Sequence, residues 1–244
     1  MLLELNGVSL RFGQVEALRD ISFHAQSGEV TCLLGDNGAG KSSVIRVLSG
    51  VYAPTSGSYS IDGRAVQMSS PRDALANGIA TVHQDLGLIP LMSVWRNFVL
   101  GAEPTVGKAF WKRIDVNTAR TVAVQAMSEL GITVNDADQP VGNMSGGERQ
   151  SLAIARAIQR GARILILDEP TAALGVKQAD IVLDNVVKAK ARGIGVVLVT
   201  HNPQHAYQVG DVFVVLRQGR VVACAQRSDV DPQTLGRLMS GTDR

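Results

Sequence analysis

Residues 35–42 read GDNGAGKS, and this stretch decides the fold because it fits the pattern G-x-x-x-x-G-K-[ST]. Glycines let the backbone curl until successive N–H groups point at one anion, and the helix that follows directs its positive end there. Lys41 adds a mobile charge for the β- and γ-phosphates of a nucleotide, and Ser42 offers a hydroxyl to Mg²⁺. The residues expected to hold the nucleotide here are Gly35, Asp36, Asn37, Gly38, Ala39, Gly40, Lys41, Ser42 and Ser43.

The segments around this loop supply the context that a phosphate loop requires. Glu29–Leu34 predicts a buried strand before it, and Lys41–Leu48 predicts a helix after it. Further runs rich in Val, Ile and Leu predict buried strands at Ile79–Val82, Ile164–Leu167 and Ile194–Val199. Helical patterns alternate with these strands, one starting at Pro71 and ending before Gly78, the other covering Val176–Arg192. The alternation indicates an α/β fold with a largely parallel sheet.

Antiparallel strands are expected at both ends of the core. Apolar residues at the N-terminus predict strands added to one edge of the sheet; they are Leu3, Leu5, Val8, Ile21 and Phe23. Near the C-terminus, Val212–Leu216 and Arg220–Ala225 flank Gln218-Gly219 and predict a hairpin.

The middle of the chain differs from both ends. From Leu86 to Gln159 the strand signal disappears, and two helical patterns remain, at Asn117–Leu130 and Gly146–Gln159. We therefore expect one domain over 1–244, with residues 1–85 and 160–227 forming the core and its β subdomain. Residues 86–159 form an inserted helical subdomain, and 228–244 form a polar tail with one weak helical pattern.

Composition excludes several classes of protein. The chain has 244 residues and is 45% hydrophobic, which is too apolar for a disordered protein. A net charge of +2 indicates no nucleic-acid partner from bulk electrostatics. Two cysteines without CxxC spacing favour a reducing compartment. Neither a membrane-spanning run nor a secretory signal is apparent, so we expect a cytoplasmic protein that reaches a membrane only by docking on a partner.

A second acidic element indicates the class of reaction. Ile164–Glu169 reads ILILDE, a buried strand that ends in two carboxylates. Because side chains alternate along a strand, Asp168 and Glu169 are expected to point apart and to have different roles. Asp168 would hold the Mg²⁺ shell, while Glu169 would polarise a water that attacks the γ-phosphate.

A second helix start resembles an anion site. Residues 144–150 read MSGGERQ, in which Ser145 and Glu148 have the spacing of a capping box. Gly146 and Gly147 leave the helix N-terminus bare of side chains and open to an anion. Because the chain already has one phosphate loop, we expect Ser145, Gly146 and Gly147 to serve a nucleotide held by another copy.

Taken together, these motifs resemble the ATP-binding-cassette (ABC) ATPase family over almost the whole chain. Residues 35–42 look like its Walker A motif, residues 144–150 its signature, and residues 164–169 its Walker B motif. Gln84 looks like the Q-loop residue, His201 the switch histidine, and Phe12 the aromatic that stacks on adenine. The resemblance implies a P-loop NTPase (RecA-like) core, an antiparallel β subdomain and an inserted α-helical subdomain.

The resemblance also implies the roles of these residues. ATP and Mg²⁺ are the expected cofactors, and the expected metal ligands are Ser42, Gln84 and Asp168. The residues expected to act in catalysis are Glu169, His201, Gln84 and Lys41. Two copies are expected to close head-to-tail, with each ATP between one Walker A motif and the signature of the partner.

One position departs from the family pattern. After residues 169–171 the family usually has Ser-Ala-Leu-Asp, whereas this chain has Ala-Ala-Leu-Gly over 172–175. The usual aspartate reaches the partner's Walker A motif, and Gly175 has no carboxylate. The change puts in doubt the contact between the two sites and their equivalence.

Three segments are similar to monosaccharide importer ATPases of the ribose/fructose type: Gln84–Glu103, Thr171–Val176 and His201–Arg220. Residues 84–101 are expected to contact integral membrane permease subunits, because they carry large apolar residues: Leu88, Ile89, Leu91, Met92, Trp95 and Phe98. The implied function is uptake of a simple sugar from the cytoplasmic face of the membrane, with a periplasmic sugar-binding protein involved indirectly.

Three alternatives remain open from the sequence. An exporter ATPase for lipid or drug would have the same nucleotide site. A soluble ABC ATPase acting on nucleic acid is less compatible with a single cassette of low net charge. A regulatory cassette that binds ATP without hydrolysing it is suggested only by Gly175.

Overall fold

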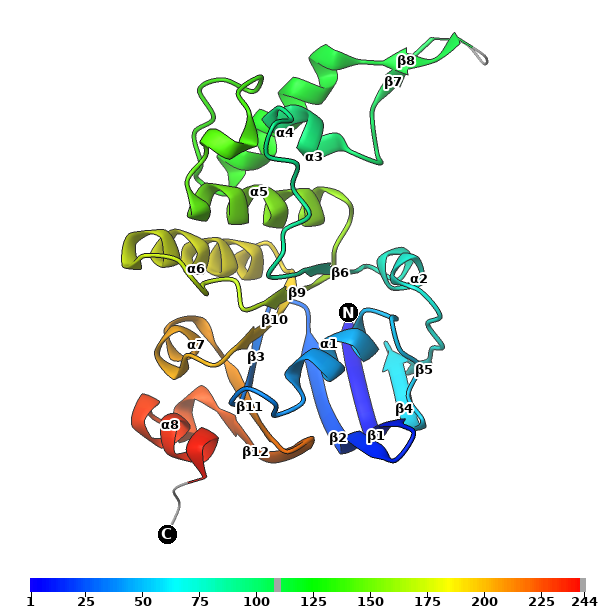
Figure 1. Cartoon of the computed structure of the whole chain (residues 1–244), viewed down its shortest axis with the longest axis vertical. Helices are drawn as coiled ribbons and strands as arrows, with labels where there is room; N and C mark the ends of the chain where they lie inside the picture. Colours follow the sequence, from blue (N-terminus) through cyan, green and yellow to red (C-terminus); the bar gives the residue numbers. More distant parts are fainter. Residues whose placement is uncertain (108–110, 242–244) are drawn as a thin grey trace. The chain divides into compact units, whose positions relative to one another are not determined.

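The computed structural model describes residues 1–107 and 111–241 (Figure 1). The chain forms two compact units. The first, here called the core unit, comprises residues Met1–Gln84, Gly161–Pro170 and Val186–Arg244. The second, here called the helical unit, comprises Asp85–Arg160 and Thr171–Asn185.

A six-stranded sheet forms the centre of the core unit, in the order β12-β11-β3-β10-β9-β6. Its strands are β3 (Val30–Leu34), β6 (Ile79–Val82), β9 (Ile164–Asp168), β10 (Gly195–Thr200), β11 (Val212–Arg217) and β12 (Arg220–Gln226). All neighbours pair in parallel except β11 and β12, which form the predicted antiparallel hairpin. Strands β3 and β10 are buried along their whole length, as their Val and Leu content predicts. The α/β fold with a largely parallel sheet is therefore confirmed.

The N-terminal strands form a separate sheet, so the expectation that they extend an edge of the parallel sheet is wrong. Its order is β2-β1-β4-β5, with β1 (Leu2–Phe12), β2 (Val15–Gln26), β4 (Ser56–Ile61) and β5 (Arg64–Ala65). The long hairpin of β1 and β2 pairs from Leu2↔Gln26 to Phe12↔Val15. The main-chain groups of these two strands therefore bond to each other rather than to the parallel sheet. Alternate residues of this hairpin enter the hydrophobic core that also contains Val214.

Short helices complete the core unit: α1 (Lys41–Leu48), α2 (Pro71–Ala76), α7 (Pro203–Val209), α8 (Pro232–Ser240) and the 3-10 turn η3 (Arg227–Asp229). Helix α1 has the predicted bounds, and Ser70 caps α2 by accepting from the N–H of Asp73. The tail contains α8, which buries Leu235 and Met239. Its weak helical pattern thus corresponds to a packed helix.

The helical unit contains α3 (Val94–Val99), α4 (Val116–Glu129), the 3-10 turn η2 (Val141–Asn143), α5 (Gly146–Gln159) and the first part of α6 (Val176–Ala191). It also contains two strands of two residues each, β7 (Thr105–Val106) and β8 (Arg113–Ile114), which the sequence analysis missed. Helix α3 was missed as well. Its Trp95 and Phe98 are buried, so the prediction that they form part of an exposed docking surface is wrong.

The segment Thr171–Asn185, which the sequence analysis left in the core, belongs to the helical unit. Asn185 on α6 donates its side-chain N–H to Oγ of Ser151 on α5, at 2.6 Å. Across the described ranges 1–107 and 111–241, none of the helices combines the length and apolar character that crossing a bilayer requires.

Candidate nucleotide-binding site

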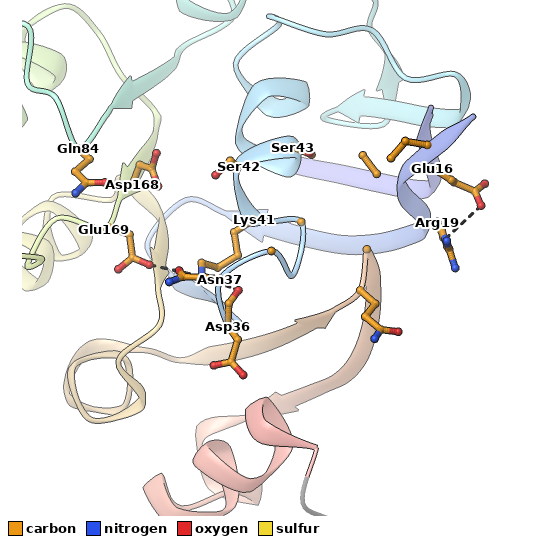
Figure 2. Close-up of a pocket in the computed structure, with 16 residues that line it drawn as sticks. Glu16, Arg19, Asp36, Asn37, Lys41, Ser42, Ser43, Gln84, Asp168 and Glu169 are labelled. Carbon is orange, nitrogen blue, oxygen red and sulfur yellow. Dashed lines mark hydrogen bonds and ion pairs between the residues drawn. The ribbon is translucent and has the colours of Figure 1, made fainter. Parts of the chain in front are cut away.

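A cavity of about 700 Å³ lies in the core unit where the phosphate loop follows β3 (Figure 2). The parallel strands bring the carboxyl ends of β3, β6 and β9 to one edge, which is where α/β sheets bind ligands. The lining residues are Val15, Glu16, Ala17, Arg19, Asp36, Asn37, Gly38, Gly40, Lys41, Ser42, Ser43, Gln84, Asp168, Glu169, Gln218 and Gly219.

The phosphate loop leaves the start of α1 free of side-chain capping. Gly40 occupies the N-cap position with φ of 108°, in the left-handed region, and no side chain caps the helix. A β-carbon at Gly40 would be strained by this φ, so glycine is required. The N–H groups of the first turn are therefore presented to a ligand, which supports the predicted role of the loop.

Lys41 is held inside this loop. Its buried side chain donates from Nζ to the carbonyl oxygen of Gly35, at 2.5 Å, and to that of Asp36, at 3.3 Å. Nζ also lies 3.6 Å from Oε1 of Glu169. The ammonium group is thus placed between the loop and the end of β9, as Figure 2 shows.

Both carboxylates at the end of β9 line the cavity, and Figure 2 shows Asp168 and Glu169 extending in different directions, as expected. The strand ends at Asp168, and Glu169 has φ of +48°, a left-handed backbone conformation. Oε1 of Glu169 lies 2.9 Å from Nδ1 of His201, which follows β10. An uncommon backbone conformation that places a carboxylate beside Lys41 and His201 is typical of functional sites.

Asp168 is electrostatically distinct from Glu169. Partial burial raises the pKa of its carboxyl group, and the charge of Glu169 raises it further, while His83, Lys41 and Arg46 oppose the shift. A cation beside Asp168 would offset the unfavourable free energy of its charged form. Ser42 and Gln84 line the same cavity, so a hydroxyl, an amide and a carboxylate are available there as oxygen donors, the set that Mg²⁺ prefers.

Residues that the sequence analysis missed form the rest of the cavity. Gln218-Gly219, at the turn between β11 and β12, lies against Ala17 and Arg19 of β2. Gly219 accepts a hydrogen bond from the N–H of Arg19 and donates one to the carbonyl oxygen of Ala39. The turn was visible in the sequence, but its partners lie about 200 residues away, so no local signal indicated this role.

Phe12 does not line the cavity. The residue is 43% exposed, and its ring meets the ring of Tyr52 edge-on, with 5.0 Å between centroids. It lies next to the turn that joins β1 to β2, opposite Val15, which does line the cavity.

The second predicted anion site lies in the helical unit, at the start of α5. The capping box is present: Ser145 accepts from the N–H of Glu148, and the Glu148 carboxylate accepts from the N–H of Ser145. A β-carbon at Gly146 would lie 2.7 Å from Cδ2 of Leu174, and one at Gly147 would lie 3.1 Å from the carbonyl oxygen of Gln178. These glycines therefore permit close packing on residues 174–178, a reason that the sequence analysis did not anticipate.

Gly175 precedes α6 and is exposed. Its carbonyl oxygen accepts from the N–H groups of Gln178 and Ala179, which makes it the N-cap of α6. No heavy atom lies within 4 Å of the position that a β-carbon would take. Nothing in the packing of the unit explains the absence of the aspartate.

Comparison with known proteins agrees with this geometry. The family model for the ABC transporter matches residues 18–172. The chain is 37% identical to the xylose/arabinose import ATP-binding protein XylG of Sulfolobus acidocaldarius, covering 98% of this chain and 94% of that protein. It is also 37% identical to the fructose import ATP-binding protein FrcA of Rhizobium meliloti, with the same coverage. The ribose import ATP-binding protein RbsA 2 of Rubrobacter xylanophilus is 38% identical, but the chain spans only 45% of it.

Solved structures show the same fold. A nucleotide-free ATP-binding cassette from an ABC transporter superposes with a TM-score of 0.81 at 22% identity, covering 92% of this chain and 91% of that one. The ADP conformation of another cassette gives a TM-score of 0.83 at 22% identity, covering 98% and 94%. With a phosphate loop, a carboxylate pair and relatives that match almost its whole length, the chain belongs to the ABC transporter family and is an ATP-hydrolysing cassette of that family.

Proposed function

We propose that this ATPase drives the import of a simple sugar, as a peripheral subunit on the cytoplasmic face of the membrane. The relatives that match nearly the whole chain are named for import of xylose/arabinose and of fructose. The assignment of Glu169 as the catalytic base rests on one observation. Its Oε1 atom lies 2.9 Å from Nδ1 of His201 and 3.6 Å from Nζ of Lys41, beside the phosphate loop.

Each residue has a defined task in this proposal. Lys41 and the loop N–H groups bind the β- and γ-phosphates, and Glu169 polarises the attacking water and accepts its proton. His201 fixes the direction of the Glu169 carboxylate and lies close to the γ-phosphate. Asp168, Ser42 and Gln84 would hold Mg²⁺, which, when bound, neutralises charge on the phosphates. Phe12 would stack on adenine by a movement of the β1–β2 turn, since it stands just outside the cavity.

The site is completed by a second copy in this proposal. Ser145, Gly146 and Gly147 of the partner subunit would close over the nucleotide, so neither copy hydrolyses ATP alone. The start of α5 supports this arrangement in part, because Ser145 and Gly146 are partly exposed there, whereas Gly147 is buried.

The membrane partner would dock on the loop of residues 89–92 within the segment 84–101. Leu91 is 91% exposed and Ile89 is 44% exposed, although Trp95 and Phe98 are buried. Exposed aliphatic residues on a short loop are suited to an apolar contact with permease subunits. A periplasmic sugar-binding protein would take part only through those subunits.

Uptake by the assembled transporter tests the proposal. The chain is purified with its membrane subunits, placed in vesicles with ATP on the cassette side, and supplied with labelled pentoses and hexoses through the binding protein. We expect uptake of one sugar class with the wild type and none with Glu169→Gln. ATP hydrolysis that responds to lipids or drugs but to no sugar would contradict the import assignment.

A further inference from the structure

The loop of residues 89–92 is built around one buried side chain, Asn97 of α3, which is completely shielded from solvent. Its Oδ1 accepts from the N–H of Ile89 at 2.8 Å. Its Nδ2 donates to the carbonyl oxygens of Ile89 and Met92, both at 3.0 Å, and to that of Ser93 at 3.2 Å. One carboxamide therefore binds both ends of a loop whose tip, Leu91, is almost wholly exposed.

The other side of this loop is bonded to the segment that leads into α5. The N–H of Gly142 donates to the carbonyl oxygen of Pro90 at 2.8 Å, and the N–H of Val141 donates to that of Met92 at 3.0 Å. Ser93 and Pro140 form an antiparallel bridge. Two separate stretches of the helical unit are thus joined by main-chain bonds, with the carboxamide of Asn97 behind them.

Three residues separate Gly142 from the first turn of α5. The N–H of Met144 donates to the carbonyl oxygen of Val141 at 3.0 Å, and Nη1 of Arg149 donates to the carbonyl oxygen of Met144 at 2.8 Å. Ser145 then starts α5. A displacement of the 89–92 loop therefore reaches the start of α5 through a short, continuous set of hydrogen bonds.

The contact between the two stretches has little free space. A β-carbon at Gly142 would lie 3.2 Å from the carbonyl oxygen and 3.6 Å from Cβ of Pro90. Because Pro90 and Gly142 are both exposed, the two main-chain hydrogen bonds are the link between the stretches rather than buried packing. The glycine allows Pro90 to approach.

We propose that Asn97 is a positioning residue that holds the 89–92 loop on the segment 139–142, and that this link couples permease contact at Leu91 to the partner's nucleotide at Ser145–Gly147. The inference rests on the proposed function, since it takes the permease as the occupant of the loop and a second copy as the nucleotide donor. Energetic coupling between two sites is reciprocal, so nucleotide binding must also alter the loop.

Hydrogen exchange tests the coupling without a permease. The full chain carrying Glu169→Gln, which slows hydrolysis, is measured with and without MgATP. We expect added protection at residues 35–43 and 145–149, and a change of at least roughly threefold in exchange at residues 89–93. Absence of protection at 35–43 and 145–149 would contradict the proposed dimer, whereas protection there with an unchanged loop would overturn this inference alone.

Two variants and one control locate the link. Asn97→Ala should accelerate exchange of the Ile89 and Gly142 amides by roughly tenfold, the factor for one lost hydrogen bond, and abolish the MgATP response of the loop. Gly142→Ala tests the same contact without removing a polar group, so it serves if Asn97→Ala does not fold. Asn185→Ala is the matched control, because Asn185 is equally buried in the same unit but bonds to Ser151.

The control distinguishes positioning from general destabilisation. Asn185→Ala should retain the MgATP response at residues 89–93, even with lower overall stability. Loss of the response in Asn185→Ala to the same extent, or its persistence in both Asn97→Ala and Gly142→Ala, would overturn the assignment of Asn97.

Discussion

Two helices of this chain begin at glycine-rich turns, yet glycine has a different purpose in each. Before α1, Gly40 has a left-handed backbone, and no side chain caps the helix. Before α5, the helix is closed by the Ser145–Glu148 capping box, and Gly146 has an ordinary backbone packed against Leu174. The first turn needs glycine for conformation and the second needs it for contact distance. Similar motifs can therefore satisfy different physical requirements.

The largest expected effect separates the chemistry of the two regions. Glu169→Gln should lower ATP turnover by about 10²–10⁴-fold while nucleotide binding persists, because an amide cannot accept the proton of water. Glu148→Gln is the counterpart in α5, and it should change turnover little because glutamine also completes a capping box. Phosphate release and equilibrium nucleotide binding measure the two effects. Wild-type turnover in Glu169→Gln would exclude it as the base.

A substitution at the first turn should cost more stability than one at the second. Gly40→Ala forces a methyl-bearing residue to adopt φ of 108°, and we expect a loss of about 1–3 kcal/mol in the free energy of unfolding. Leu18 lies 3.2 Å from the added carbon, so Leu18→Ala provides the control. Because the strain is in the backbone, the double variant should not regain the stability lost in Gly40→Ala. A regained free energy of unfolding, measured by denaturant, would contradict the conformational explanation.

Gly146→Ala should behave in the opposite way. The added carbon meets the end of the Leu174 side chain, which can move, so we expect a loss of about 1 kcal/mol. Leu174→Ala removes the obstructing atoms and should restore much of the loss, apart from its own cost. A double-mutant cycle of unfolding free energies measures this coupling. Strict additivity would show that packing on Leu174 is not the reason for glycine.

The smallest expected effect concerns charge near the first turn. A carboxyl group whose pKa is raised on folding binds its proton more tightly in the folded state. The contribution of Asp168 to stability is therefore full below about pH 4 and is lost as the pH rises through its raised value. Asp168→Asn should raise the thermal midpoint of the nucleotide-free protein at neutral pH, and the difference should shrink toward pH 4. A difference in thermal midpoint that grew as the pH fell would contradict the raised pKa of Asp168.

Local patterns were sufficient to predict much of this molecule. Helix α1 and strand β9 follow from short apolar runs and from the glycines and carboxylates beside them. Patterns of that kind depend only on neighbours in the chain. The burial of Trp95 depends on a distant contact, because its indole N–H donates to Asp138, 43 residues away. Nothing near position 95 in the sequence indicates this contact.

The same limit applies to the cavity. Lys41 and Glu169 were predicted because their motifs are contiguous in sequence. Gln218-Gly219 meets Ala17 only after two sheets have assembled, so its place in the cavity depends on packing between distant strands. The backbone conformation of Glu169 also required the structure, since nothing in the sequence indicates its left-handed φ.

The contact between Lys41 and Glu169 has a consequence for nucleotide binding. The ammonium group is shared between two main-chain oxygens and the carboxylate that would activate water. A triphosphate that binds Lys41 must compete with these three oxygens for the ammonium group. The apparent affinity for ATP therefore includes the free energy of breaking these contacts.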